Sequence, residues 1–158
     1  MNTIQKDPNN IGGIAKIWLI PSRLISSPAS SIPAVLATLP IGWGDDTWEF
    51  APIFQSGSFM EDMKSSTAGN YFESTVTFKI PKIAYYSRDV ISLLSGKPIA
   101  ILMLDENGQY LLVGNTDYPM RLTTSARTGA EISDLNHIAL SYTGRNPLPV
   151  SFASNPFA

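Results

Sequence analysis

The chain contains no cysteine, so a disulfide, a thiolate nucleophile and a cysteine-ligated metal centre are all excluded. It is also poor in charge, because Asp, Glu, Lys and Arg make up 15% of its 158 residues, against about 25% in an average soluble domain. A protein that binds nucleic acid by neutralising phosphates needs a basic excess, and the formal net charge here is -2. The low charge therefore excludes that class and favours surfaces that are covered by other proteins.

A long apolar run is also missing. The first apolar stretch, residues 14–20, is short and is interrupted by Lys16, which excludes a membrane span or a signal-peptide core there. We therefore expect no membrane partner, and synthesis in the cytoplasm without export. Neither of the glycine-rich motifs that bind nucleotide phosphates occurs in the chain, and we expect no cofactor.

Hydrophobic residues make up 44% of the chain, which is enough to form a core, and the length is typical of one domain, 1–158. Proline and serine concentrate in residues 21–40, and proline breaks both helices and strand ladders. We interpret this stretch as an extended arm that carries apolar residues, among them Ile32, Val35 and Leu36. Repeated prolines indicate a second extended arm at residues 146–158.

Much of the remaining chain has the pattern of β-strands. The clearest case is residues 71–80, where Phe72, Val76 and Phe78 alternate with polar side chains. Further strands are expected at residues 14–20, 47–54, 57–63, 99–104, 109–114, 118–122 and 138–143. We interpret residues 47–80 as one long antiparallel hairpin whose adaptable tip is residues 65–70.

One amphipathic helix is predicted at residues 83–95 and ends at Gly96. Its apolar stripe consists of Ile83, Tyr86, Val90, Leu93 and Leu94. Asn107 and Gly108 predict a tight hairpin turn with positive φ angles, and residues 123–134 predict a polar loop. These elements together predict a mainly β fold, a β-sandwich or partly closed barrel with one amphipathic helix and extended terminal arms.

The one histidine of the chain, His137, follows Asp134 by three residues. A hydrolase would need both of them beside a nucleophile, and no serine lies in a Gly-x-Ser-x-Gly turn. We therefore predict a structural role for His137 and no enzymatic activity, with a small hydrolase that uses His137 as one alternative.

Acidic and aromatic clusters offer two further possibilities. Some carboxylates could hold a hard cation or supply the pair that glycoside hydrolysis needs, namely those of Asp45, Asp46, Glu49, Glu61 and Asp62. A simpler interpretation is that these carboxylates lie on loops and are exposed to solvent. Trp43 and Trp48 could form an aromatic platform for a ligand, so a carbohydrate- or peptide-binding β-sandwich module is a second alternative. We favour core or subunit contacts for both tryptophans.

Several segments together resemble small virion proteins of tailed phages and prophages of Bacteroidota, including the crAss-like group. They are YFESTVTFKIPK (71–82), LDENGQYLLVG (104–114), YPMRL (118–122), and the short pieces TG, DLN and YTG (128–129, 134–136 and 142–144). The resemblance implies a tail-tube or neck-ring type of subunit, which forms a homo-oligomeric ring or tube at the tail or portal end of the virion. Its implied partners are copies of itself and neighbouring tail or portal proteins, with DNA only as passing cargo in a lumen.

The arms, the tryptophans and the hairpin tip predict a subunit interface. Its residues are Ile32, Val35, Leu36, Trp43, Trp48, Ser65, Ser66, Thr67 and Gly69. We expect the two arms to cross neighbouring subunits. Deletion of residues 65–69 is expected to leave a folded monomer and to weaken assembly.

Overall fold

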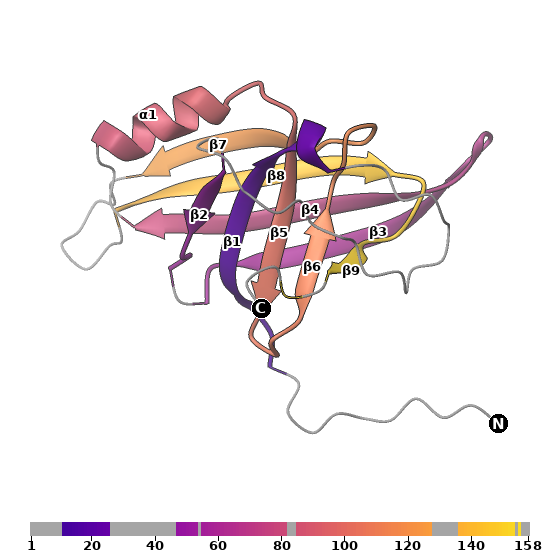
Figure 1. Ribbon diagram of the computed structural model, residues 1–158, viewed down its shortest axis with the longest axis horizontal. Coiled ribbons are helices and arrows are strands. Elements are labelled where there is room, and N and C mark those ends of the chain that lie inside the picture. The colour runs from indigo at the N-terminus through magenta and orange to yellow at the C-terminus, as the bar shows by residue number, and fades with distance from the viewer. Residues whose placement is uncertain are drawn as a thin grey trace.

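The computed structural model describes residues 11–25, 47–53, 55–81, 85–127, 136–153 and 155. Its strands form two antiparallel sheets, which cross each other steeply in Figure 1. Sheet A has the strand order β2 (Trp48–Phe50), β1 (Ile14–Pro21), β5 (Ile99–Asp105), β6 (Tyr110–Val113) and β9 (Ser151–Ala153). Sheet B has the order β3 (Ser58–Ser66), β4 (Gly69–Pro81), β8 (His137–Asn146) and β7 (Arg121–Arg127). The mainly β prediction is confirmed, in the form of a sandwich of two sheets.

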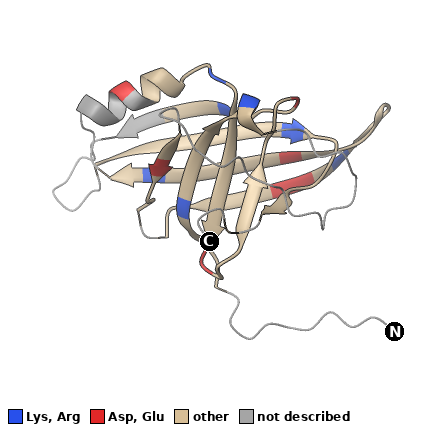
Figure 2. Ribbon diagram, viewed as in Figure 1, with Lys and Arg blue, Asp and Glu red and all other residues tan. Residues whose placement is uncertain are grey.

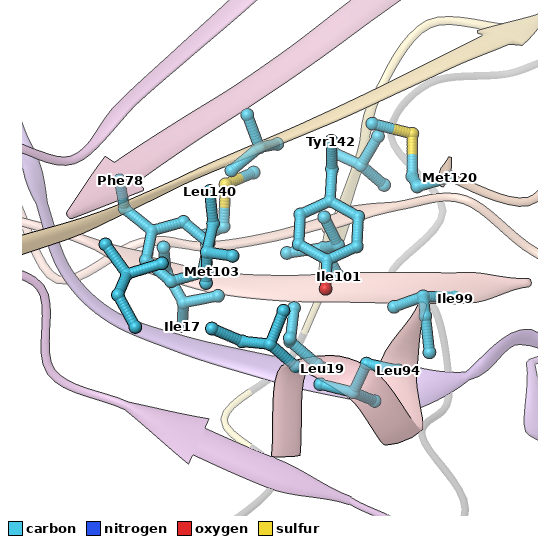
Figure 3. Close-up of a cluster of buried hydrophobic side chains, with 14 residues drawn as sticks. Ile17, Leu19, Phe78, Leu94, Ile99, Ile101, Met103, Met120, Leu140 and Tyr142 are labelled. Carbon is cyan, nitrogen blue, oxygen red and sulfur yellow. The ribbon is translucent and has the colours of Figure 1, made fainter. Parts of the chain in front are cut away.

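The core lies between the two sheets. Val76 and Phe78 of β4 and Leu140 and Tyr142 of β8 are buried on the inner face of sheet B, as the alternation of strand side chains requires. They pack against inner-face residues of sheet A, which include Ile17, Leu19, Ile101 and Met103 (Figure 3). The far face of sheet A is apolar too, since Trp18, Ile20, Ala100 and Leu102 form a second buried cluster. Strand β5 is therefore buried on both faces and central, as predicted.

The helix α1 (Tyr85–Leu94) lies at one end of the sandwich (Figure 1). Ile91 and Leu94 join the core between the sheets, whereas Leu93 is 56% exposed. The predicted stripe was therefore wrong at Leu93 and lacked Ile91. Ile91 and Leu94, three apart, share the buried face, whereas Leu93 is two residues from Ile91 and points away from it. Gly96 ends the helix with a φ of 76°. None of the helices in the described residues is long and apolar enough to cross a membrane.

The predicted hairpin over residues 47–80 divides between the sheets. Strand β2 pairs with β1 in sheet A, and only β3 pairs with β4 in sheet B. The chain crosses between the sheets before β3, where Gly57 lies so close to Ile14 that a Cβ on the glycine would be 2.9 Å from the Ile14 Cβ. The local pattern predicted a strand in each segment, although β2 is shorter and β3 is longer than expected. It could not predict the partners of these strands.

The two predicted connections also differ. At residues 105–108 only Gly108 has a positive φ, 81°, and the Asp105 carboxylate accepts hydrogen bonds from the backbone N–H groups of Asn107 (2.9 Å) and Gln109 (2.7 Å). The loop is thus a turn with one left-handed glycine rather than a two-residue primed turn. The predicted polar loop is wrong for Thr123 to Arg127, which belong to β7 (Arg121–Arg127). The β-branched threonines suit a strand that pairs along its length with β8.

The described residues of both predicted arms are part of the folded domain, and those of the second arm include the end of β8 and strand β9. Pro21 belongs to β1, a 3-10 turn (Ser22–Leu24) follows, and Ile25 is buried. The Thr116 hydroxyl is within hydrogen-bond distance of the carbonyl oxygens of Ser22 (3.0 Å) and Ile25 (2.8 Å). Residues 26–40 of the first arm and 154 and 156–158 of the second lie outside the described residues.

Tyr142 is fully buried, and its hydroxyl has no hydrogen-bond partner among the described residues. Burial raises the pKa of this phenol, so the unfolding free energy falls as the pH rises above the unfolded pKa of about 10. Tyr142→Phe keeps the ring stacked on Phe78 and is expected to raise the free energy of unfolding by about 1–3 kcal/mol. Urea unfolding measures this, and at alkaline pH the gain should grow. A loss of stability would mean that the hydroxyl is hydrogen-bonded, for example to a buried water.

Candidate functional site

The sequence-predicted catalytic pair is described only in part. His137 is the first residue of β8, half-buried, and lies opposite Pro81 on β4 and Arg127 on β7. Asp134 lies outside the described residues. His137 is thus a member of the strand ladder at the edge of the core.

The acidic residues do not converge. Glu61 and Asp62 are neighbours on β3, so their side chains point to opposite faces of sheet B. Glu49 contacts Lys16 (3.2 Å) and accepts a hydrogen bond from the Trp18 indole (3.0 Å). Asp45 and Asp46 lie outside the described residues, and within the described part of the chain no three His, Asp or Glu side chains could hold a metal ion.

Of the two tryptophans in the predicted interface, only Trp48 is described. It is half-buried on β2 and packs against the main core, so part of its ring serves the fold. Trp43, together with the predicted interface residues Ile32, Val35 and Leu36, lies outside the described residues.

The hairpin tip that the sequence indicated is exposed, and the hairpin projects beyond the other strands (Figure 1). Thr67 and Ala68 form the turn, and Ser66 and Gly69 close it, with a φ of 123° at Gly69. The Ser66 hydroxyl donates to the Gly69 carbonyl (2.9 Å) and accepts from the Ala68 N–H (3.2 Å). The tip was expected to adapt its shape to a partner, but these bonds give it a shape of its own.

Charged side chains brace the base of this tip on the outer face of sheet B. Glu73 lies between Lys64 (2.5 Å) and Arg145 (3.6 Å), and the Arg145 guanidinium lies over the Tyr71 ring, 5.6 Å from its centre. The hydrogen bond from Lys64 lowers the pKa of Glu73, and the same bond raises the pKa of Lys64. The carboxylate's stabilising effect is present above the unfolded pKa of Glu and is lost as the pH falls through the lowered folded value. In Figure 2, acidic and basic positions lie on the strands of sheet B toward the end that carries the tip, and the tip itself is uncharged.

On the inner face, Glu61 connects the hairpin to the C-terminal segment. Its carboxylate accepts hydrogen bonds from the Val150 N–H (2.8 Å) and from the buried Ser74 hydroxyl (3.3 Å). The sequence indicated Glu61 as a possible metal ligand or catalytic carboxylate and not as this connection, because Ser74 and Val150 are 13 and 89 residues away along the chain.

Glu61→Ala is expected to lower the free energy of unfolding by about 1–3 kcal/mol, because it leaves the Val150 N–H and the Ser74 hydroxyl without their acceptor. Glu61→Gln keeps an acceptor oxygen and should lose less. The matched control is Asp62→Ala, the neighbouring exposed carboxylate on the other face, which should change stability little. Urea unfolding compares the three, and equal losses in Glu61→Ala and Asp62→Ala would contradict the role of Glu61.

Two exposed methionines on β3 were not singled out by the sequence. Met60 is 57% exposed on the outer face, and Met63 is 63% exposed on the inner face beyond the core. The sequence signal that could have identified them is the presence of apolar residues within the otherwise polar segment of β3. Methionine is flexible and adapts to irregular contacts, so β3 offers apolar surface on both of its faces.

The outer face of sheet B has an uncharged centre of small hydroxyl residues. They are Ser58, Thr75, Thr77, Ser141 and Thr143, which the register places side by side on β3, β4 and β8. The Ser58 and Thr77 hydroxyls are 2.6 Å apart, and beside them is a shallow depression of about 200 Å³ between Lys79, Thr123 and Ala139. A centre depleted of charge is typical of surfaces that contact another protein.

Both edges of sheet B are free within the described residues. The sheet ends at β3 on one side and at β7 on the other. Neither strand contains proline, and neither pairing with its neighbour has a register shift. Among the described residues, the edges and the hydroxyl face of sheet B are thus surfaces that another chain could contact, and sheet A likewise ends at β2 and β9. Comparisons with protein-family models, with curated proteins and with solved structures find no match to this chain.

Proposed function

We propose that this protein is a structural subunit that joins copies of itself into a closed ring or tube. One observation carries the proposal, which is that sheet B, as far as the described residues go, ends in two regular edge strands of opposite direction. Strands β3 and β8 run one way and β4 and β7 run the other. Strand β7 of one copy beside β3 of the next would therefore continue the antiparallel alternation.

Such a contact uses two different surfaces of the same chain, so it is a head-to-tail contact. Head-to-tail contacts give a ring when their rotation closes. Joining the edges also removes the unpaired N–H and C=O groups that an open sheet exposes. The exposed methionines of β3, the charge-free centre of the outer face and the low overall charge of the chain support the same conclusion.

The resemblance to virion proteins supplies the setting of this proposal. The ring or tube would belong to the tail or portal end of a bacteriophage virion and would be made in the cytoplasm of the host bacterium. Neighbouring tail or portal proteins would be its further partners, and DNA would pass through the lumen as cargo.

Met60→Lys tests the free edge of β3. Natural sheets use lysine on edge strands to prevent pairing with other chains, so we expect this variant to weaken self-association about tenfold or more, or ~1.4 kcal/mol. The matched control is Leu93→Lys on α1, where a leucine is exposed to the same extent, 56% against 57%. Native mass spectrometry or light scattering at several concentrations measures assembly, and circular dichroism checks the fold.

The comparison between the two variants decides the outcome. If Met60→Lys weakens self-association and Leu93→Lys associates as the wild type does, the contact between copies lies at β3. If wild-type protein stays monomeric at all concentrations, or if both variants assemble as the wild type does, the proposed joint is wrong.

A further inference from the structure

The turn between β5 and β6 contains the only asparagine of the chain that is followed by glycine, Asn107. Asn107 and Gly108 are both exposed. The side-chain amide of an asparagine can be attacked by the backbone nitrogen of the next residue, and glycine hinders this attack least because it has no Cβ. Asparagine is for this reason one of the thermolabile residues of proteins. The turn therefore contains the groups that deamidation requires.

Deamidation here needs no reactant besides the chain and water. The Gly108 nitrogen bonds to the Asn107 Cγ, the Cγ–Nδ2 bond breaks, and Nδ2 leaves as ammonia together with the proton that the Gly108 nitrogen gives up. Water then opens the cyclic imide at one of its two carbonyl groups and leaves an aspartate or an isoaspartate. The net change is the replacement of an amide by a carboxylic acid, without oxidation or reduction.

In the folded chain both reacting groups are held by hydrogen bonds. The Asn107 Oδ1 accepts from the Ile11 N–H (2.9 Å), and the Asn107 Nδ2 donates to the Ile11 carbonyl oxygen (2.9 Å). We call this pair of bonds the Ile11 clamp. The Asn107 Nδ2 also lies 3.4 Å from the Asp105 carboxylate, and the Gly108 N–H donates to the Asp105 carbonyl oxygen (3.1 Å). The attack on Cγ therefore requires these bonds to break first.

The backbone of residues 11–13 forms the clamp, and the Ile11 side chain does not. That side chain is 59% exposed. Gly13 brings the backbone to the turn with a φ of 123°, and its carbonyl oxygen accepts from the Glu106 N–H (3.3 Å). A residue with a Cβ is strained at this φ, so the path of the backbone at Gly13 depends on glycine.

We propose that Asn107 is a deamidation site that the Ile11 clamp holds back in the folded chain. The reaction also weakens the clamp, because the new carboxylate cannot donate to the Ile11 carbonyl oxygen and carries the same charge as the neighbouring Asp105. Deamidation is thus coupled to the release of residues 11–13 from the turn. The loss of ammonia makes the change irreversible. The inference is independent of the proposed assembly and needs no second copy of the chain.

Two substitutions open the clamp in different ways. Ile11→Pro removes the N–H donor, and Gly13→Ala strains the backbone that leads to Ile11. Since the net effect of one hydrogen bond corresponds to about two- to tenfold in a rate, each variant is expected to deamidate at Asn107 about two- to tenfold faster than the wild type. The matched control is Ile11→Ala, which keeps both backbone groups and should keep the wild-type rate.

The full-length proteins are incubated at mildly alkaline pH, and peptide mass spectrometry measures the fraction of Asn107 that is converted. Circular dichroism checks the fold of each variant. Wild-type protein unfolded in guanidinium chloride gives the rate without the clamp, and it should exceed the rate of the folded wild type. Asn70, which is exposed but is followed by Tyr71, should remain an amide in the same samples.

The outcomes that overturn the proposal are distinct. If Asn107 is not converted even in the unfolded wild type, it is not a deamidation site. If the folded wild type reacts as fast as the unfolded protein, or if a folded Ile11→Pro or Gly13→Ala variant keeps the wild-type rate, the clamp does not hold the reaction back. Should one of these two variants fail to fold, the other variant and the comparison of folded with unfolded wild type decide the question. An equal acceleration in Ile11→Ala would also contradict a clamp made by the backbone.

Discussion

Phe78→Ala is expected to lower the free energy of unfolding by about 3–5 kcal/mol. The Phe78 ring is 1% exposed on the inner face of β4 and belongs to the main core. It stacks on Tyr142, with ring centres 6.5 Å apart, and lies 5.9 Å from the Phe50 ring of β2. Its removal leaves a cavity that both sheets border, so the loss of packing affects the whole sandwich.

Urea unfolding followed by circular dichroism measures this loss. The matched control is Phe152→Ala, because Phe152 is also a strand phenylalanine and is 42% exposed. It should cost much less than Phe78→Ala, since large costs arise from buried side chains. If both variants were equally stable, the packing of the two sheets around Phe78 would be contradicted.

Gly114→Ala is expected to cost about 2–5 kcal/mol, from two separate causes. Gly114 has a φ of 85°, and the left-handed region costs an L-residue about 1–2 kcal/mol. An added Cβ would also lie 3.0 Å from the Ile99 carbonyl oxygen and 3.1 Å from the Met120 Cγ, and such overpacking costs about 1–3 kcal/mol.

Gly108→Ala separates the two causes. Gly108 has nearly the same φ, 81°, but nothing lies within 4 Å of an added Cβ. This variant should therefore show only the backbone cost, and Gly114→Ala should exceed it. Thermal or urea unfolding of both variants makes the comparison, and equal losses would mean that the backbone of β5 can move away from Gly114.

Features that depend on residues close together in the chain could be predicted from the amino-acid sequence. Alternation over residues 71–80 was sufficient to predict the strand and its buried face, because strand side chains change sides at every residue. Gly96 after an apolar helical stripe marked the helix end, and the apolar run at residues 99–104 marked the central strand. The exposed hairpin tip at Ser65 to Gly69 could be located in the same way, from small polar residues between two strands.

The pairing of the strands could be read only from the folded chain. Residues 47–54 and 57–63 have similar local patterns, yet β2 belongs to sheet A and β3 to sheet B. The partners of Glu61, at Ser74 and Val150, are 13 and 89 residues away. Which strands pair depends on the relative stability of all possible strand pairings in the folded chain. Local periodicity depends only on neighbouring residues and therefore does not predict the pairing. The edges of β3 and β7, which no other described strand covers and on which the proposed assembly depends, are therefore visible only in the folded chain.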